Sequence, residues 1–124
     1  MFSHIRTSKE NKEVVTQLTN KLNLGAENVI ARIALTYSLA QDKKLDLKEL
    51  KDSGGKEYSK SVLFGDQFPM YIGIICTKYH LHSSDKDLQK LLKLHLDKGL
   101  DLLSKKAQTS DSFSLLNELI GLHQ

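Results

Sequence analysis

Few residues in this sequence have the type and spacing that catalysis or metal binding requires. The single cysteine, Cys76, could serve as a nucleophile or sulfur carrier beside a base or cation, but its place in IGIICTKY favours a small buried hydrophobe. His80 and His82 would need two further ligands to hold a metal ion, so their spacing is much looser than that of a zinc site. His95 lies among leucines at helical spacing, which favours a core or interface histidine.

The common catalytic signatures are missing from the sequence. It contains no nucleotide-binding glycine loop, no pair of cysteines and no G-x-S-x-G nucleophile elbow. No two residues form a convincing general acid and base. We therefore expect a protein that is not an enzyme and that needs neither a cofactor nor a metal ion.

Basic side chains near the start of the chain suggest a different chemistry, the binding of phosphate groups. The segment FSHIRT alternates in character and predicts a short strand that runs directly into a helix. A strand, a helix, a glycine-containing turn and a second helix follow the order of the ribbon-helix-helix DNA-binding module, in which two chains pair their strands. In such a ribbon Arg6 would contact a base or a phosphate. Alternation would bury Ser3, Ile5 and Thr7 and would present Phe2, His4 and Arg6.

The turn LNLGAEN offers a second way to hold a phosphate, because the helix after it begins with free backbone N–H groups around residues 26–28. Glu27 is an unfavourable neighbour for an anion there. Alternatively, any helical hairpin needs such a turn, and Lys9, Lys12 and Lys21 are ordinary solvated charges. The net charge of +3, from 18 basic and 15 acidic residues, is too small to decide between these readings.

The elements that must position these groups are mainly helices. Apolar residues at helical spacing predict helices over residues 9–22, 26–40 and 85–107, an apolar helix after residue 66, and a short last helix from residue 110 or 111. The polar segment 41–65 is the predicted loop, with room for a brief strand or hairpin in YSKSVLF. We therefore expect a compact, mainly α-helical domain, with a short N-terminal strand in a ribbon-helix-helix-like arrangement.

Local signals place the ends of several of these helices. Thr7 and Glu10 form a predicted capping box for the first helix, and Gly25 supplies the positive φ that its exit requires. Asp66 is the predicted N-cap of the apolar helix, with Pro69 tolerated in its first turn. The last helix is expected to dock through Phe113, Leu116, Leu119 and Ile120.

The predicted helix over residues 85–107 carries a broad apolar stripe. Its members are Leu88, Leu91, Leu92, His95, Leu96, Gly99, Leu102 and Leu103. Charged residues are predicted on the opposite face, namely Lys86, Lys90, Lys93 and Asp97, with Lys93 and Asp97 able to pair at i,i+4. Leu94 and Leu100 flank the stripe, which predicts a second contact surface and hence an oligomer.

Length and composition bound the remaining possibilities. The 124 residues suit a single domain, and 27% charged content is that of an ordinary globular protein. No apolar run approaches the roughly 18 residues that cross a bilayer, and the N-terminal segment lacks the apolar core of a signal peptide. We therefore expect one domain over residues 1–124, cytoplasmic and with no membrane partner.

Four segments together resemble the DndE family of bacterial DNA phosphorothioation proteins: SHIRTSKENKEVVTQL, ENVIARIALTYSL, GKEYSKSVLFGD and LQKLLKLHLDKGLDLL. Family members show an N-x-x-A-R-x-A-L-x-x-S-L helix, a G-x-E-F/Y segment leading to L-x-G, and a late H-L-x-x-G-x-x-L-L helix. The matched positions are Arg6, Thr7, Ser8, Lys9, Asn28, Ala31, Arg32, Ala34, Leu35, Ser38, Leu39, Gly55, Glu57, Tyr58, Leu63, Gly65, His95, Leu96, Gly99, Leu102 and Leu103. The likeness covers nearly the whole chain.

This resemblance implies a non-enzymatic member of a machine that replaces a non-bridging phosphate oxygen of DNA with sulfur. Its partners would be duplex DNA, notably nicked duplex, further copies of itself in a homotetramer, and the sulfurtransferase and ATPase subunits of the same system. The implied contacts to the DNA backbone are Arg6, Lys9, Lys12 and Lys21, whereas Arg32 could be structural. One departure stands out: family members usually have a G-x-T-G-x-T-P-N turn, and here KLNLGAEN places Lys21 and Leu24 at the two glycines.

Two functional hypotheses follow. In the first, an accessory subunit binds duplex DNA through phosphates with little sequence preference. In the second, an oligomeric scaffold organises the ATPase and sulfurtransferase subunits without touching DNA. A sequence-reading repressor of the ribbon type is a weaker third.

Overall fold

The computed structural model describes residues 2–109, 111, 114–115 and 117–118. The elements follow one another as β1 (His4–Arg6), α1 (Lys9–Lys21), α2 (Glu27–Ala40), the 3₁₀ helix η1 (Leu47–Glu49), β2 (Glu57–Ser59), α3 (Lys60–Phe64), the 3₁₀ helix η2 (Gly65–Gln67), α4 (Phe68–Tyr79) and α5 (Leu88–Thr109). The predicted fold class, mainly α-helical with a short N-terminal strand, is confirmed. The residues predicted to dock the last helix lie outside the described residues.

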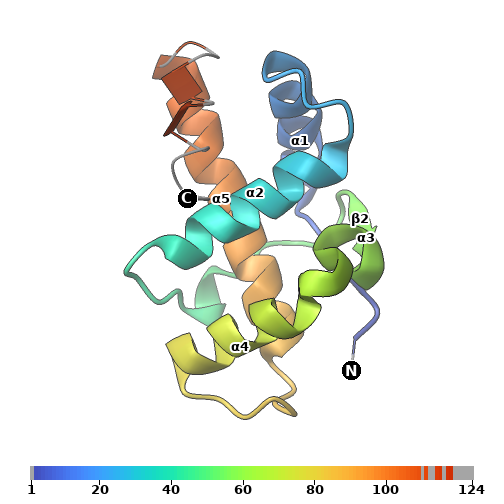
Figure 1. Ribbon diagram of the computed structural model, residues 1–124, viewed down its shortest axis with the longest axis vertical. Coiled ribbons are helices and arrows are strands. Elements are labelled where there is room, and N and C mark those ends of the chain that lie inside the picture. The colour runs from blue at the N-terminus through green and yellow to red at the C-terminus, as the bar shows by residue number, and fades with distance from the viewer. Residues whose placement is uncertain (1, 110, 112–113, 116, 119–124) are drawn as a thin grey trace.

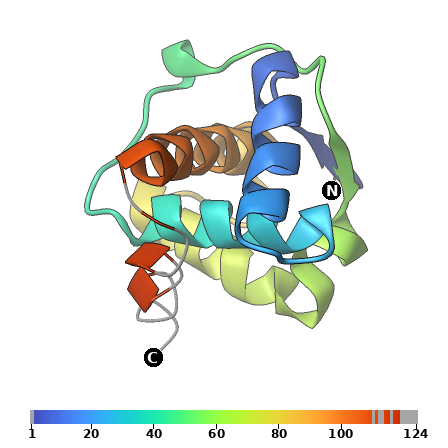
Figure 2. The ribbon, with the colours of Figure 1, turned by 90° about the horizontal axis from the view of Figure 1, so that it is seen from above.

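Helix α5 forms the centre of the fold. It contacts α1, α2, α4, β1 and η1, and Figure 2 shows these elements arranged around it. The predicted apolar stripe lies in the core, apart from half-buried Leu102. The flanking residues Leu94 and Leu100 are 4% and 0% exposed within the single chain. They therefore do not form the second contact surface that was predicted for an oligomer, because elements of the same chain cover them.

Helices α2 and α5 cross at very short range (Figure 1). A Cβ atom placed on Gly99 would lie 1.8 Å from the backbone oxygen of Ala34 and 2.4 Å from its carbonyl carbon. Real Cβ atoms do not approach a backbone so closely, so only glycine permits this crossing. The glycine of the late helix motif is thus a packing requirement.

Helix α1 begins at the predicted residue, but its cap differs from the prediction. Ser8, not Thr7, is the N-cap, and its Oγ accepts a hydrogen bond of 3.2 Å from the N–H of Asn11. The Thr7 hydroxyl instead accepts the N–H of Lys56 at 2.9 Å. Thr7 therefore fastens the start of α1 to a segment that is distant in sequence.

Strand β1 pairs with β2 of the same chain. The antiparallel register is His4 with Ser59, Ile5 with Tyr58, and Arg6 with Glu57. The predicted two-chain ribbon is thus replaced by an intrachain partner, which overlaps the brief strand allowed in YSKSVLF within the predicted loop. The predicted alternation holds for buried Ile5 and Thr7 and for exposed His4 and Arg6, but Ser3 is exposed.

Helix α4 starts later than predicted, because residues 65–67 form η2 and Gln67 takes the N-cap position in place of Asp66. It is also not buried on all sides. Tyr71, Ile72 and Ile75 face the core, while Met70 and Ile74 are 49% and 37% exposed.

His95 is a buried core histidine, as its place on the apolar stripe predicted. Its Nδ1 lies 2.8 Å from the Ser38 hydroxyl, and its Nε2 lies 2.6 Å from the Tyr79 hydroxyl. The Tyr79 oxygen also accepts the N–H of Leu45 at 2.8 Å, so the tyrosine joins the loop after α2 to the ring. Desolvation, together with nearby Lys78, lowers the pKa of His95 to about 4. The ring thus links α2, α4, α5 and the loop after α2 while uncharged.

Because the folded pKa of His95 is depressed, the unfolded chain binds the proton more readily between pH 6.5 and about pH 4. The contribution of His95 to the free energy of unfolding is fully present above pH 6.5. It decreases by about 3 kcal/mol in total as the pH drops through that window. We expect the difference in unfolding free energy between the wild type and His95→Gln to shrink by that amount from pH 7 to pH 4. Urea denaturation at each pH measures it, and a difference independent of pH would contradict the prediction.

Candidate nucleic-acid interface

The four basic residues predicted to contact DNA lie at two separate ends of α1. Arg6 ends β1, Lys9 begins α1 and Lys12 follows one turn later, whereas Lys21 ends the helix. Twelve residues of α-helix span roughly 18 Å, and nine residues at 100° per step place Lys21 about 180° around the axis from Lys12. Lys9 and Lys12 therefore lie one turn apart at the start of α1, three residues after Arg6 in sequence, and Lys21 is separated from them.

Arg6 is exposed but already has an anionic partner. Its guanidinium donates a hydrogen bond of 2.8 Å to the Glu57 carboxylate, its cross-strand neighbour, and His4 Nε2 lies 3.4 Å from the same oxygen. The hydrogen bond from Arg6, with the nearby His4 and Arg6 charges, holds the pKa of Glu57 below its usual value. Because the pair is half exposed, it is weak, and Arg6 has further N–H donors to offer a phosphate.

Lys9 and Lys12 extend their side chains from the first turn of α1 into solvent. Both residues are exposed, and no carboxylate of the described part of the chain lies within ion-pair distance of either ammonium group. Residues three apart in a helix share a face, so the two charges are neighbours. Unpaired, adjacent cations are the arrangement that phosphate groups attract most readily.

The backbone at the start of α1 already carries an anion from the protein. The Asp52 carboxylate accepts the N–H of Lys9 at 2.9 Å and the N–H of Gly54 at 3.0 Å. These hydrogen bonds, the one from Lys9 first, lower the pKa of Asp52. A phosphate at this end of α1 would therefore meet the lysine side chains and not the free N–H groups of the helix.

Lys21 points towards the C-terminal end of α5. Its ammonium group donates a hydrogen bond to the backbone carbonyl of Ala107, in the last turn of that helix. A cation at a helix C-terminus satisfies an otherwise unpaired carbonyl and interacts favourably with the helix dipole. This contact gives Lys21 a stabilising role, which the sequence did not reveal because Ala107 is distant along the chain.

Gly25 has a positive φ of +83° in the turn before α2, but the predicted role at the exit of α1 is taken by Asn23, which directly follows the C-cap Leu22 and has φ of +54°. Ala26 is the N-cap of α2 and no side chain caps the helix. However, the Glu27 carboxylate lies at this end, where it accepts the Thr16 hydroxyl at 2.7 Å and sits 3.7 Å from the ammonium of Lys56. The unfavourable neighbour expected from the sequence is thus present beside the helix N-terminus.

Lys56 is a basic residue that the sequence interpretation missed. It lies between the Gly54-Gly55 pair and β2, and the β pairing brings it to the start of α1, where its carbonyl accepts the N–H of Thr7 at 2.8 Å. Gly55 allows this approach, because a Cβ there would lie 2.0 Å from the backbone oxygen of Ser8. Nothing in the loop composition signals which charged residue would return to the N-terminal strand.

Lys93 and Asp97 were predicted on the solvent face of their helix, and that placement is wrong. They are 6% and 2% exposed and form an ion pair of 2.7 Å, so the i,i+4 pairing itself is confirmed. Lys93 also donates to the backbone oxygen of Asp52 at 2.9 Å. The pair lies under the start of α1 because loop 50–56 and α1 cover this side of α5.

The described residues hold no group of three or more histidine, cysteine or acidic side chains arranged to bind a metal ion. No helix in the described part of the chain is both long enough and apolar enough to cross a membrane. Cys76 is a free, half-buried cysteine of α4.

Comparison with known proteins and structures identifies the family to which the chain belongs. A search of curated proteins finds no match. Among solved structures, the fold is similar to DndE from Escherichia coli B7A, involved in DNA phosphorothioation modification, with a TM-score of 0.66, 17% identity, and coverage of 83% of this chain and 98% of the other. A glycine-to-lysine double mutant of DndE gives a TM-score of 0.67 at 17% identity, covering 82% and 97%. Residues 4–111 match the family described as DNA sulphur modification protein DndE. The chain therefore belongs to the DndE family of DNA sulphur modification proteins.

Proposed function

We propose that this chain is a non-enzymatic accessory subunit of a DNA phosphorothioation system that binds duplex DNA, nicked or intact, through its phosphates. The observation that carries the proposal is the adjacency of Lys9 and Lys12, exposed and without an anionic partner in the described part of the chain. Arg6 ends the strand that precedes α1 and is proposed as a third contact. Membership of the DndE family supports DNA as the source of the phosphates.

The proposed mechanism is electrostatic. Each lysine or arginine that neutralises a phosphate releases condensed counterions, so the affinity falls steeply with salt and depends little on sequence. Arg6, Lys9 and Lys12 are the proposed contacts. Lys21 remains a predicted contact, although its hydrogen bond to Ala107 favours a structural role.

Reversing the charges at Lys9 and Lys12 tests the proposal. We expect the Lys9→Glu/Lys12→Glu variant to bind nicked and intact duplexes at least about tenfold more weakly, and the slope of log affinity against log salt to fall by about two. Fluorescence anisotropy across a salt series measures both quantities. Affinity insensitive to salt, or unchanged in this variant, would refute the proposed contacts.

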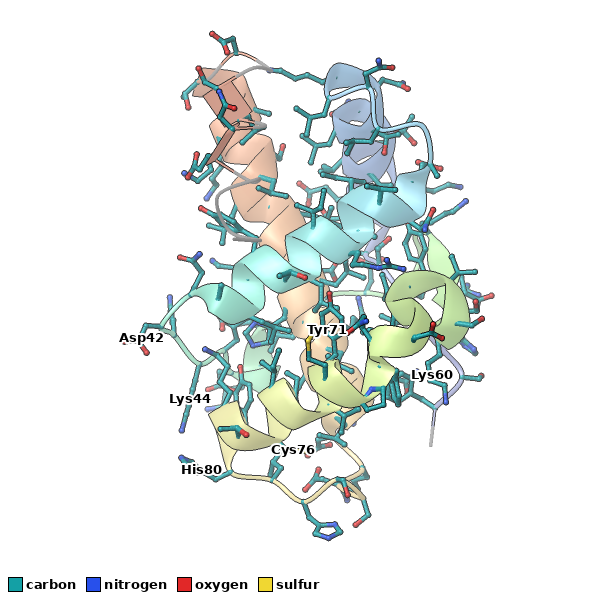
Figure 3. All side chains as sticks on the ribbon, in the orientation of Figure 1. Asp42, Lys44, Lys60, Tyr71, Cys76 and His80 are labelled. Carbon is teal, nitrogen blue, oxygen red and sulfur yellow. The ribbon has the colours of Figure 1, made fainter. Side chains whose placement is uncertain are left out.

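A matched control comes from the loop after α2. Lys43 and Lys44 are also exposed, and Figure 3 shows Lys44 far from α1. The Lys43→Glu/Lys44→Glu variant makes the same change in net charge and is expected to bind DNA nearly as well as the wild type. The single variant Lys21→Glu distinguishes a structural role of Lys21 from a DNA contact. A structural role predicts a lower melting temperature with an unchanged salt slope of DNA binding.

The alternative function, a scaffold that assembles without touching DNA, is favoured by the exposed apolar face of α4. Met70 and Ile74 lie one turn apart on this face and are 49% and 37% exposed. We propose that this face joins copies of the chain into a homo-oligomer, a tetramer, because exposed apolar neighbours mark contact surfaces. The phosphorothioation ATPase and sulfurtransferase subunits are the proposed further partners.

The mass of the protein in solution tests this assembly. We expect Met70→Glu/Ile74→Glu to dissociate the oligomer to monomers in light scattering while the helical circular dichroism is retained. If the wild type is monomeric at the concentrations used for binding, or if the variant assembles unchanged, the proposed face is wrong. An intact oligomer that binds no DNA would favour the scaffold function.

A further inference from the structure

A hollow of about 360 Å³ lies between three segments of the chain, beside the basic surface described above. Its walls come from β1, from residues 50–53 and from the first turns of α5. The lining residues are His4, Ile5, Arg6, Leu50, Ser53, Gln89, Lys90 and Lys93. The volume falls within the range of small-ligand sites, about 300–1,000 Å³, and is larger than a phosphate group alone requires.

Every charged or titratable residue in this described lining is basic. Arg6 and Lys90 supply full positive charges near the opening, with side chains 47% and 60% exposed, and His4 adds a third group that can be protonated. The fourth, Lys93, is buried and neutralised by Asp97.

The anions around the rim leave much of this charge available. Glu57 shares its carboxylate between Arg6 and His4, and Asp87 lies 4.0 Å from the Lys90 ammonium, at the outer limit of an ion pair. An exposed pair of that length contributes little. A dianionic phosphate would therefore gain two strong donors without having to break a tight ion pair of Lys90.

The hollow is held in shape before any ligand arrives. The Gln89 side chain donates to the backbone oxygen of His4 at 2.6 Å, which ties β1 to α5. Lys93 donates to the backbone oxygen of Asp52 at 2.9 Å, which ties the loop to the same helix. Half-buried Leu50 gives the hollow an apolar part, against which a sugar ring can pack. Preformed donors lower the cost of binding because they need little ordering.

We propose that this hollow binds a phosphate monoester together with its sugar, as found at the 5′ end of a DNA strand or in a free mononucleotide. Arg6 forks two N–H groups onto the phosphate oxygens, Lys90 supplies the second charge, and the Ser53 hydroxyl donates a neutral hydrogen bond. A monoester fits better than an internal phosphodiester, because it carries more charge and has a free end that can enter a hollow. The strand-end form of this inference rests on the proposed function, whereas the mononucleotide form does not.

Titration of the full chain with thymidine 5′-monophosphate, followed by amide chemical shifts, tests the hollow directly. We expect saturable shifts at Ser53 and Gln89 that thymidine itself does not produce. The Lys90→Gln variant should bind the nucleotide about tenfold more weakly, as loss of a charged hydrogen bond predicts. Lys105→Gln, an exposed lysine near the other end of α5, is the matched control and should bind as the wild type does. Equal shifts with thymidine, or none, would overturn the proposal.

Duplexes that differ only at a nick distinguish the two sources of the phosphate. Tighter binding to a nick with a 5′-phosphate than with a 5′-hydroxyl, lost in Lys90→Gln, identifies the strand end as the ligand. Equal binding to both nicks, with the nucleotide still bound, supports the hollow as a site for a free nucleotide. Nucleotide binding without any duplex binding leaves the hollow standing while the proposed function fails. Duplex binding with no nucleotide shifts overturns the hollow and leaves the proposed function intact.

Discussion

Replacing Asp97 with alanine is expected to lower the free energy of unfolding by about 3–5 kcal/mol. Its carboxylate is 2% exposed and accepts three hydrogen bonds, from the N–H of Ser8 at 3.1 Å, the amide of Asn11 at 2.8 Å and the ammonium of Lys93 at 2.7 Å. The alanine variant leaves the buried lysine without its counter-charge and leaves two further donors unpaired. Breaking one side of a buried pair costs far more than the pair itself contributes.

Two variants control for the loss of one carboxylate and for the loss of the charge pair. Asp101, on the same helix as Asp97, forms an ion pair of 2.7 Å with Lys51 of the loop, with side chains 28% and 35% exposed, so Asp101→Ala should cost less than about 1 kcal/mol. The double variant Lys93→Met/Asp97→Leu removes both charges and should be more stable than Asp97→Ala alone. Urea denaturation measures all three, and equal losses for Asp97→Ala and Asp101→Ala would contradict the prediction.

Replacing Gly99 with alanine is expected to destabilise the fold by about 3 kcal/mol or more, at the upper end of overpacking effects. The new methyl group would sit 1.8 Å from the Ala34 carbonyl oxygen, so α2 and α5 must move apart along their contact. The neighbour is backbone and not a flexible side chain, so a change of rotamer cannot relieve the clash. Thermal or urea denaturation measures the loss.

Gly73 provides the matched control for this substitution. It also lies within a helix, α4, but no atom comes within 4 Å of the Cβ that alanine would add. Gly73→Ala should therefore stabilise the protein by about 0.5–1 kcal/mol through its higher helix propensity. If the two alanine variants changed stability in the same direction, close helix packing at Gly99 would not be the cause.

Sequence patterns predicted those parts of the fold that depend on local periodicity. Helices α1 and α2 were expected over residues 9–22 and 26–40, and they span Lys9–Lys21 and Glu27–Ala40. Repeated apolar spacing is a property of neighbouring residues, so it can be read along the chain. The exit of α1 is assigned to Gly25 by the sequence, whereas Asn23 takes the left-handed conformation there. The start of α4 was misplaced because Asp66 resembles a cap, whereas the 3₁₀ turn at residues 65–67 comes first.

Features that depend on distant segments were not predictable in this way. Lys93 and Asp97 carry charge, so a periodic pattern assigns them to solvent, yet loop 50–56 and α1 bury them. A brief strand is allowed in YSKSVLF by the sequence and β2 overlaps it, but its pairing with β1, some fifty residues earlier, could not be read from local pattern.

The same limit applies to the candidate interface. The basic character of α1 could be predicted from sequence, but not the partners of its cations. Lys21 bonds to a carbonyl of α5, and Arg6 pairs with Glu57, so their environments depend on contacts between distant residues. Lys56 joins the start of α1 only after β2 pairs. The exposure of Lys9 and Lys12 follows from their helix face alone.

The pairing of β1 with β2 also has a consequence for folding kinetics. It joins Arg6 to Glu57, so the ladder closes a loop that contains α1, α2 and η1. Closing a long loop costs entropy that only the finished contacts repay, so long-range strand pairing belongs to late steps of folding. We therefore expect the strand that carries Arg6 to be set in place after the helices have assembled, so that Arg6 takes its position beside Glu57 late in folding.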